Sequence, residues 1–171
     1  MLGTPPHKTP PRVIAFCMFA TLACAEVALA TPTDIGSVYG SNAQGSSFAD
    51  YPRPGNEIAA IRIRGGNKVD AVQFTYRAAN GVLFAAARHG GGGGDERTYI
   101  FQPGEFLTGI YGYAGDVITC LGFTTTRTSY QTHGNCSGVS FSIRAPHGFR
   151  VRGIYGRSGD LLDGIGLYAD Q

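Results

Sequence analysis

The sequence predicts an all-β domain, and three observations support this prediction. Charged residues make up 15% of the 171 residues, below the usual quarter, while glycine contributes 26. Apolar and polar residues alternate over short segments such as Ile61-Arg62-Ile63-Arg64 and Phe149-Arg150-Val151-Arg152, which is the period of a half-buried strand. A strand–loop–strand pattern then occurs three times along the chain, with no amphipathic helix of useful length between the copies.

The N-terminal residues 1–30 are predicted to be a secretory signal peptide. Basic residues precede an apolar run, and Ala28-Leu29-Ala30 fits the small-x-small pattern of a cleavage site. A membrane anchor is the alternative, but the apolar run is short and contains Glu26. We therefore expect one secreted domain over residues 31–171, without membrane insertion.

The two cysteines of this predicted domain are Cys120 and Cys136. In a secreted chain such a pair favours a disulfide. It would close a loop of about 15 residues and add roughly 3 kcal/mol in the chain-entropy treatment. The two residues lie at unequal distances from the apparent turn near Tyr130, so a bridge and two separate thiols both remain open.

Charge and residue spacing argue against several classes of function. The formal net charge is only +2, so no strong field for nucleic acid is expected. His133 and Cys136 have a metal-like spacing, but no second pair completes a site. Asp160 and Asp163 lie three residues apart in one loop and need not flank a glycosidic bond. We expect no metal, no cofactor and no enzymatic activity.

The internal repeat is the strongest signal in the chain. Its first shared position is an isoleucine, at Ile61, Ile110 and Ile154. A glycine follows five residues later, at Gly66, Gly115 and Gly159. Another glycine lies sixteen residues upstream, at Gly45, Gly94 and Gly138. Apolar residues also recur in phase, so three similar β units predict a closed three-sided arrangement with few free strand edges.

These units resemble the jacalin-related lectins, especially their mannose-binding branch. The resemblance covers Ile35 to Asp170 and is carried by Gly156 to Tyr168, which contains a Gly-x-x-x-Asp loop, and by the glycine-rich Tyr39 to Phe48. Tyr39-Gly40-Ser41 is most similar to the zymogen-granule lectins, whereas Phe48 stands where plant members usually have Trp. The resemblance implies a β-prism I fold, in which three four-stranded antiparallel sheets have pseudo-threefold symmetry.

The resemblance also implies a sugar site between the glycine-rich loop and the loop from Gly159 to Asp163. Asp163 would accept hydrogen bonds from two sugar hydroxyls, and the N–H groups of Asp160 and Leu161 would donate to ring and exocyclic oxygens. The N–H of Gly45 would donate from the opposite side. An aspartate at a strand start can also merely cap its turn, but the glycine and the repeat favour binding.

The same resemblance suggests which sugar is bound. Galactose-binding relatives carry aromatic residues in this loop, whereas this chain has Asp160 and Leu161. The absence of Trp makes recognition polar. We expect metal-independent binding of mannose- or glucose-type glycans, with the loop from His89 to Arg97 tuning the choice of glycan.

The repeat predicts a second, weaker sugar site. Its candidate residues copy the first loop and its opposing glycines: Gly66, Asn67, Lys68, Asp70, Gly93 and Gly94. The alternative is that Asp70 caps its turn and that Lys68 crowds the pocket. The middle unit has Thr119 opposite Gly138, and a neutral hydroxyl cannot replace the carboxylate, so no third site is expected.

Four arginines lie on outward faces of the predicted strands: Arg62, Arg64, Arg150 and Arg152. They are either solvated residues that protect strand edges or a patch for sulfated and other anionic glycans. If the arginines form an anionic-glycan patch, the alternative function is that of an adhesion or interaction protein that binds anionic or sulfated polysaccharide. Both hypotheses make glycans the partner, exclude nucleic acid and leave an oligomer open.

Overall fold

The computed structural model describes residues 32–171, so the predicted signal peptide over residues 1–30 lies outside the described residues. This part of the chain consists of thirteen strands. They are β1 (Thr33–Tyr39), β2 (Ser46–Asp50), β3 (Glu57–Gly65), β4 (Val69–Arg77), β5 (Leu83–Ala85), β6 (His89–Gly90), β7 (Asp95–Ile100), β8 (Leu107–Ala114), β9 (Ile118–Thr125), β10 (Ser129–Gly134), β11 (Val139–Arg144), β12 (Arg150–Ser158) and β13 (Leu162–Asp170). Within residues 32–171 there is no helix with the length and hydropathy needed to span a membrane.

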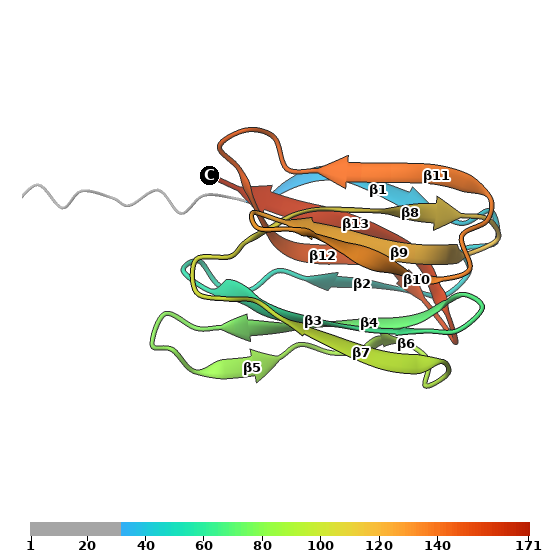
Figure 1. Ribbon diagram of the computed structural model, residues 1–171, viewed down its shortest axis with the longest axis horizontal. Coiled ribbons are helices and arrows are strands. Elements are labelled where there is room, and N and C mark those ends of the chain that lie inside the picture. Colours follow the sequence, from blue (N-terminus) through green and yellow to red (C-terminus); the bar gives the residue numbers. More distant parts are fainter. Residues whose placement is uncertain (1–31) are drawn as a thin grey trace, which may run out of the picture.

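The strands form three antiparallel sheets around a shared core (Figure 1). The first sheet has the order β1-β13-β12-β2, the second β10-β9-β8-β11 and the third β5-β4-β3-β7. In the third sheet β6 pairs with the same edge of β4 as β5 does, further along that strand. The two short strands therefore fill one interrupted position. The predicted all-β prism of three four-stranded sheets is confirmed.

The repeat positions predicted from the sequence are equivalent in the structure. In each sheet the isoleucine of the inner hairpin faces an apolar residue of the next strand, in the pairs Ile61–Phe74, Ile110–Phe123 and Ile154–Leu167. All six side chains are at most 3% exposed. The alternation of the sequence thus places one face of every sheet in the common core.

The three inner hairpins also close in the same way. In each turn the glycine N–H donates to the carbonyl oxygen two residues later, in the pairs Gly66–Lys68 at 3.0 Å, Gly115–Val117 at 2.9 Å and Gly159–Leu161 at 3.0 Å. A register irregularity precedes each turn. The turns lie at one end of the prism, where Ser41 N–H donates to the Gly115 carbonyl and Lys68 pairs with Asp116.

The first sheet joins the two ends of the described chain. Its outer strands β1 and β2 come from the N-terminal part, whereas β12 and β13 are the last two strands. The glycine loop between β1 and β2 therefore lies beside the turn between β12 and β13. Closing the prism in this way brings the two predicted sugar-binding loops together.

Cys120 and Cys136 form a disulfide, with their Cα atoms 4.9 Å apart. The bond joins β9 to the segment that follows β10. Cys120 pairs in register with Gly134, and an irregularity in β10 between Tyr130 and His133 precedes this pair. The irregularity shifts the register of β10, so the unequal distances of the cysteines from the turn do not keep them apart.

Candidate functional site

Asp163 lies at the loop end of the first sheet, where β13 begins, and its side chain is buried. Its Oδ2 accepts a hydrogen bond from the N–H of Gly45 at 3.0 Å, and its carbonyl oxygen accepts one from the N–H of Gly40 at 2.9 Å. A Cβ atom added to Gly45 would lie 2.2 Å from Asp163 Oδ2. The position therefore requires glycine, since any side chain would displace the carboxylate.

This geometry differs from the sequence expectation in one respect. The resemblance placed the N–H of Gly45 against a sugar, whereas here it donates to Asp163. A carboxylate has about four lone-pair positions, so this bond leaves acceptor capacity on Asp163. The glycine N–H thus orients the carboxylate.

The turn that precedes Asp163 presents backbone donors. The N–H of Gly159 closes the turn on the carbonyl of Leu161, whereas the N–H groups of Asp160 and Leu161 have no acceptor among residues 32–171. Asp160 itself is exposed. Two unpaired N–H donors beside a carboxylate acceptor form a mixed site, which suits hydroxyl groups because each one both donates and accepts.

The glycine-rich segment of the third sheet forms a neighbouring wall. A Cβ atom on Gly91 would lie 2.4 Å from the carbonyl oxygen of Asp160. The segment is anchored at its start by His89, whose ring stacks on Phe48 at 3.8 Å and whose Nε2 lies 2.7 Å from Asp50 Oδ2. The predicted neighbouring loop therefore does reach the turn of Asp160.

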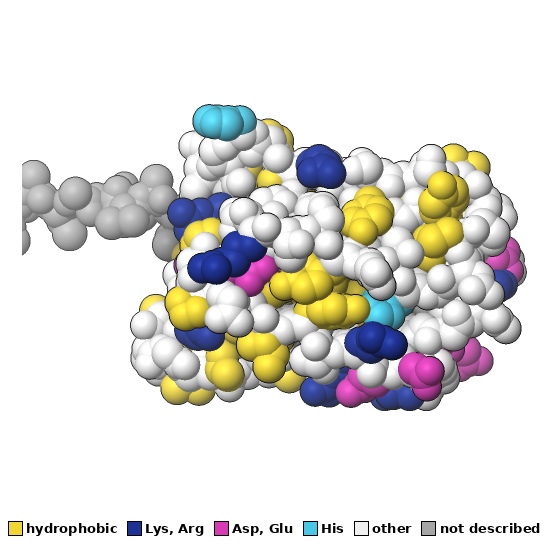
Figure 2. Space-filling view, in the orientation of Figure 1, with side chains coloured by type: hydrophobic (Ala, Val, Ile, Leu, Met, Phe, Trp, Pro, Cys, Tyr) yellow, Lys and Arg dark blue, Asp and Glu magenta, His cyan; other side chains and the backbone are white. Residues whose placement is uncertain are grey.

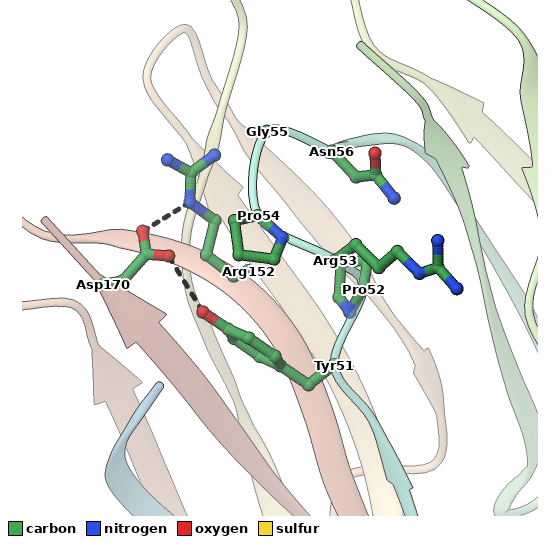
Figure 3. A pocket seen from close by; sticks show the side chains of 8 residues that line it. All are labelled: Tyr51, Pro52, Arg53, Pro54, Gly55, Asn56, Arg152 and Asp170. Carbon is green, nitrogen blue, oxygen red and sulfur yellow. Dashed lines mark hydrogen bonds and ion pairs between the residues drawn. The ribbon is translucent and has the colours of Figure 1, made fainter. Parts of the chain in front are cut away.

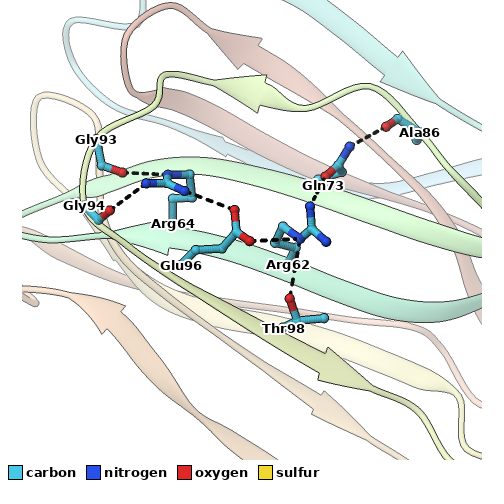
Figure 4. A network of polar contacts seen from close by, with 8 residues as sticks. All are labelled: Arg62, Arg64, Gln73, Ala86, Gly93, Gly94, Glu96 and Thr98. Atoms are coloured by element: carbon cyan, nitrogen blue, oxygen red, sulfur yellow. Dashed lines mark hydrogen bonds and ion pairs between the residues drawn. The ribbon is translucent and has the colours of Figure 1, made fainter.

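Two arginines that support the glycine loops were not identified as such from the sequence. Arg157 Nη2 donates to the carbonyl of Gln44 at 3.4 Å. Arg64 donates through Nε to the Gly93 carbonyl at 2.8 Å and through Nη2 to the Gly94 carbonyl at 2.9 Å (Figure 4). Both arginines lie three residues after a repeat isoleucine. This shared position in the repeat is the sequence signal from which the supporting role of both arginines could have been predicted.

The third sheet repeats the arrangement around Asp70. Cβ atoms on Gly93 and Gly94 would lie 2.2 Å and 2.5 Å from the Asp70 carboxylate oxygens, so the predicted neighbours are in contact. The ammonium group of Lys68 is held by Asp116 of the adjacent turn, and this hydrogen bond lowers the pKa of Asp116.

The outer part of the same turn is tied to the second sheet. Asn67 accepts hydrogen bonds from the side chain and the backbone of Asn135, at 3.1 Å and 3.3 Å. The turn of the proposed second site is therefore more constrained than the exposed turn of Asp160.

The second sheet has an internal hydrogen-bond network where the other two have a carboxylate. The Thr119 hydroxyl contacts the Ser137 carbonyl at 2.6 Å and accepts from the Ser137 N–H at 3.2 Å. It also lies 3.0 Å from the carbonyl of Tyr113, and the side chain is buried. The hydroxyl group is engaged with the protein backbone.

The four arginines do not form one patch. Arg62 and Arg64 share Glu96 on the third sheet, at 3.3 Å and 3.0 Å (Figure 4). Arg152 pairs with Asp170 at 2.5 Å, beside a hydrogen bond from Tyr51 to the same carboxylate (Figure 3). Burial and this hydrogen bond raise the pKa of Tyr51 to about 12.

Arg150, the fourth arginine, lies over the ring of Phe106 with its guanidinium carbon 4.0 Å from the ring centroid. It begins β12, whereas the predicted sugar loop follows the end of that strand. Eight residue steps of a strand separate Arg150 from Ser158, or roughly 26 Å. The pair Arg150 and Arg152 therefore lies at the opposite end of the prism from the predicted sugar loops.

The potential metal ligands are engaged in other interactions. Cys136 is in the disulfide, and His133 Nε2 lies 2.5 Å from the hydroxyl of Tyr99. Over residues 32–171, no three His, Cys, Asp or Glu side chains are grouped as a metal would require.

Comparison with known proteins identifies similar chains. The family described as the jacalin-like lectin domain matches residues 37–168. Horcolin from Hordeum vulgare is 31% identical over 146 residues, covering 82% of this chain and 98% of that protein. The jacalin-related lectin Calsepa from Calystegia sepium is 34% identical over 153 residues, covering 82% of this chain and 97% of that protein.

Solved structures show the same architecture. Malaysian banana lectin superposes with a TM-score of 0.72 at 27% identity, covering 81% of this chain and 98% of that one. A mannose-binding jacalin-related lectin from Ananas comosus gives a TM-score of 0.70 at 31% identity, covering 81% and 97%. A mannose-specific jacalin-related lectin from Morus nigra, whose structure was solved in complex with mannose, gives a TM-score of 0.71 at 27% identity. The match covers 82% of this chain and 95% of that one.

Proposed function

Because this chain belongs to the jacalin-related lectin family, whose members are carbohydrate-binding proteins and not enzymes, we propose that it is a secreted lectin for mannose- or glucose-type glycans. Binding would take place between the glycine loop containing Gly45 and the turn from Gly159 to Asp163, without a metal ion. The relatives with named specificities are mannose or mannose/glucose lectins, which supports this class of sugar.

One observation carries the proposal. Asp163 is held by Gly45 at 3.0 Å next to the unpaired N–H groups of Asp160 and Leu161. A hexose hydroxyl placed there would donate to the carboxylate and accept from a backbone N–H. Charge-assisted hydrogen bonds of this kind are shorter and roughly twice as strong as neutral ones. The turn carries aliphatic Leu161 and no aromatic ring, which favours mannose- and glucose-type sugars.

We also propose a second, weaker sugar site at Asp70. Its carboxylate lies against Gly93 and Gly94, and the ammonium group of Lys68 is occupied by Asp116. The N–H groups of Asn67 and Lys68 have no acceptor among the described residues. A single site with few apolar contacts would bind monosaccharide weakly, and millimolar affinity corresponds to about −4 kcal/mol. Two sites on one domain would raise the avidity for branched glycans.

A glycan array combined with calorimetry tests this function. Arrays would be run in low and high salt and with a chelator, and methyl α-D-mannoside would be titrated in solution. We expect mannose-type glycans to bind equally in all conditions. Binding restricted to sulfated glycans and lost at high salt would favour the alternative arginine mode instead. Loss of mannoside binding in the chelator would contradict metal independence.

A further inference from the structure

A polar groove of about 230 Å³ runs between β7 and β10. The two strands are edge strands of the third and second sheets, so the groove follows a seam of the prism. Six side chains that line it provide polar groups: Asp95, Arg97, Tyr99, Gln131, Thr132 and His133. None of them belongs to the glycine loop or to the turn from Gly159 to Asp163, although Asp95 and Arg97 lie at the end of the predicted tuning loop from His89 to Arg97.

Arg97 brings a positive charge to this groove; Asp95 lines the groove on the same face of β7 but does not form an ion pair with it. Successive strand residues point to opposite faces, and the preceding Glu96 is bound on the other face by Arg62 and Arg64. Within residues 32–171 the guanidinium of Arg97 has no carboxylate within 4.0 Å and no hydrogen-bond acceptor. Its planar fork of donors is therefore open to a ligand carboxylate.

His133 adds a neutral donor beside this charge. Burial lowers the pKa of His133, and Arg97 lowers it further, so the imidazole is neutral at pH 7. Burial raises the pKa of Tyr99, so its hydroxyl is protonated, and it forms a hydrogen bond with Nε2 of His133, 2.5 Å away. With the hydroxyl assigned as the donor in this bond, the ring proton lies on Nδ1, which has no acceptor in the described part of the chain.

The surface view is consistent with this arrangement. On the face drawn in Figure 2, a histidine and a basic side chain lie next to each other beside a band of hydrophobic side chains, over the region where β10 and β7 run in Figure 1. The seam is open to solvent at that place. A ligand can therefore enter the groove without displacing a loop.

From this geometry we infer that the groove binds an acidic sugar, a pyranose ring that carries one carboxylate. Arg97 would take the carboxylate in a bidentate pair, and His133 Nδ1 would donate to it or to a neighbouring oxygen. Asp95, Gln131 and Thr132 supply acceptors and donors for the ring hydroxyls. A groove of about 230 Å³ is below the 300–1,000 Å³ of drug-sized pockets, so it matches one sugar ring.

This inference deepens the proposed function and rests on it in one respect, namely that the ligand is a glycan. The residues are separate, because the mannose site uses the loops of the first sheet. The groove adjoins the proposed second site, since Gly65 lines it and lies 2.5 Å from a Cβ added to Gly94. An acidic unit next to a neutral hexose would extend the recognised glycan along this seam.

The test is a ¹⁵N NMR titration of the folded protein with methyl β-D-glucuronide, with methyl β-D-glucoside as the neutral counterpart. Amide shifts should concentrate on β7 and β10 for the glucuronide and be absent there for the glucoside. Arg97→Gln should weaken glucuronide binding about tenfold or more, as expected for loss of a charged hydrogen-bond partner. Arg144→Gln is the matched control, since Arg144 is exposed on β11 at the opposite edge of the second sheet.

Titration of the same samples with methyl α-D-mannoside separates this inference from the proposed function. Asp163→Asn should lose most of its mannoside binding and retain glucuronide binding, whereas Arg97→Gln should retain mannoside binding and weaken glucuronide binding. The inference is overturned if glucuronide shifts no signal on β7 or β10, if the glucoside binds there equally well, or if Arg97→Gln and Arg144→Gln behave alike. If the unmodified protein bound glucuronide but not mannoside, the proposed mannose-type function would be contradicted and the acidic-sugar groove would be supported.

Discussion

The N–H of Gly45 donates to the carboxylate of Asp163 at 3.0 Å, across 118 positions of sequence. The contact fixes the carboxylate at the one place where the N-terminal glycine loop meets the C-terminal turn. Because this bond already orients the carboxylate, fewer groups would have to be ordered on binding of the proposed sugar, which lowers the entropic cost of binding. The first three predictions follow from this relationship and its copies in the other sheets.

Asp163→Asn should fold and lose most of its mannoside affinity. The amide oxygen can still accept from Gly45, but the charged acceptor for the sugar hydroxyls is gone, at a cost of about 1.5–3 kcal/mol. Calorimetry with methyl α-D-mannoside measures the change. Glu57→Gln is the control and should bind normally, because Glu57 begins β3, at the end of that strand away from the turn of Asp70. Equal affinity of both variants would remove the sugar site from this turn.

Gly45→Ala should impair both binding and stability. The new methyl group would lie 2.2 Å from the Asp163 carboxylate and equally close to the carbonyl carbon of Ser158. Relieving such overlap by backbone shifts typically costs about 1–3 kcal/mol. Gly92→Ala is the control, because a Cβ atom there meets nothing within 4 Å. Thermal unfolding and mannoside calorimetry should separate the two variants, and indistinguishable behaviour would argue against the close packing at Gly45.

A crystal soaked in concentrated methyl α-D-mannoside should show sugar at Asp163 and, with lower occupancy, at Asp70. Thr119 should have none, because its hydroxyl is bonded to Ser137 and Tyr113. Asp70→Asn should remove the second density and leave the first. Density at Asp163 alone would reject the second site, and density at Thr119 would contradict the requirement for a carboxylate.

Glu105 should make the fold sensitive to acid. Burial acts to raise the pKa of this carboxyl, but hydrogen bonds from Thr125, the Gln102 N–H and Tyr130 outweigh it, so the net pKa is lowered. A lowered folded-state pKa gives stability that is present above the unfolded value, about 4.3, and is lost as pH falls through the folded value.

Urea unfolding of Glu105→Gln checks this dependence. The variant should be about 1–3 kcal/mol less stable than the parent at pH 7, and the difference should shrink towards pH 3. Glu57→Gln is the comparison, because Glu57 makes no side-chain hydrogen bond or ion pair in the described part of the chain. A difference that stays constant between pH 7 and pH 3 would show that the charge of Glu105 is not the stabilising feature.

The internal repeat, together with the resemblance to jacalin-related lectins, predicted which distant loops pair. Positions sixteen residues before and five residues after each isoleucine recur in phase, so threefold closure implied that Gly45 would meet Asp163 and that Gly94 would meet Asp70. Both contacts are present. The prediction worked because strand alternation and glycine turns are local properties that the chain repeats.

The roles of the arginines could not be predicted in the same way. Alternation placed Arg64 and Arg152 on outward faces, but it gave no information about which carboxylates or carbonyls those faces would meet. Arg64 reaches Gly93, Gly94 and Glu96, whereas Arg152 reaches Asp170. These contacts depend on which strands become neighbours in the sheet.

For this protein, the sequence alone determined three similar β units and their core-facing residues, because period-2 alternation and turn glycines act within a few residues. The resemblance of these units to jacalin-related lectins implied the prism and the candidate sugar loops. Only the tertiary structure decided that Gly45 donates to Asp163 and that Arg97 and His133 line one seam. Those relationships join residues from different strands or sheets, and their distances are set by register and by the closure of the prism. Neither the register of the strands nor the closure of the prism is determined by the residue at any single position.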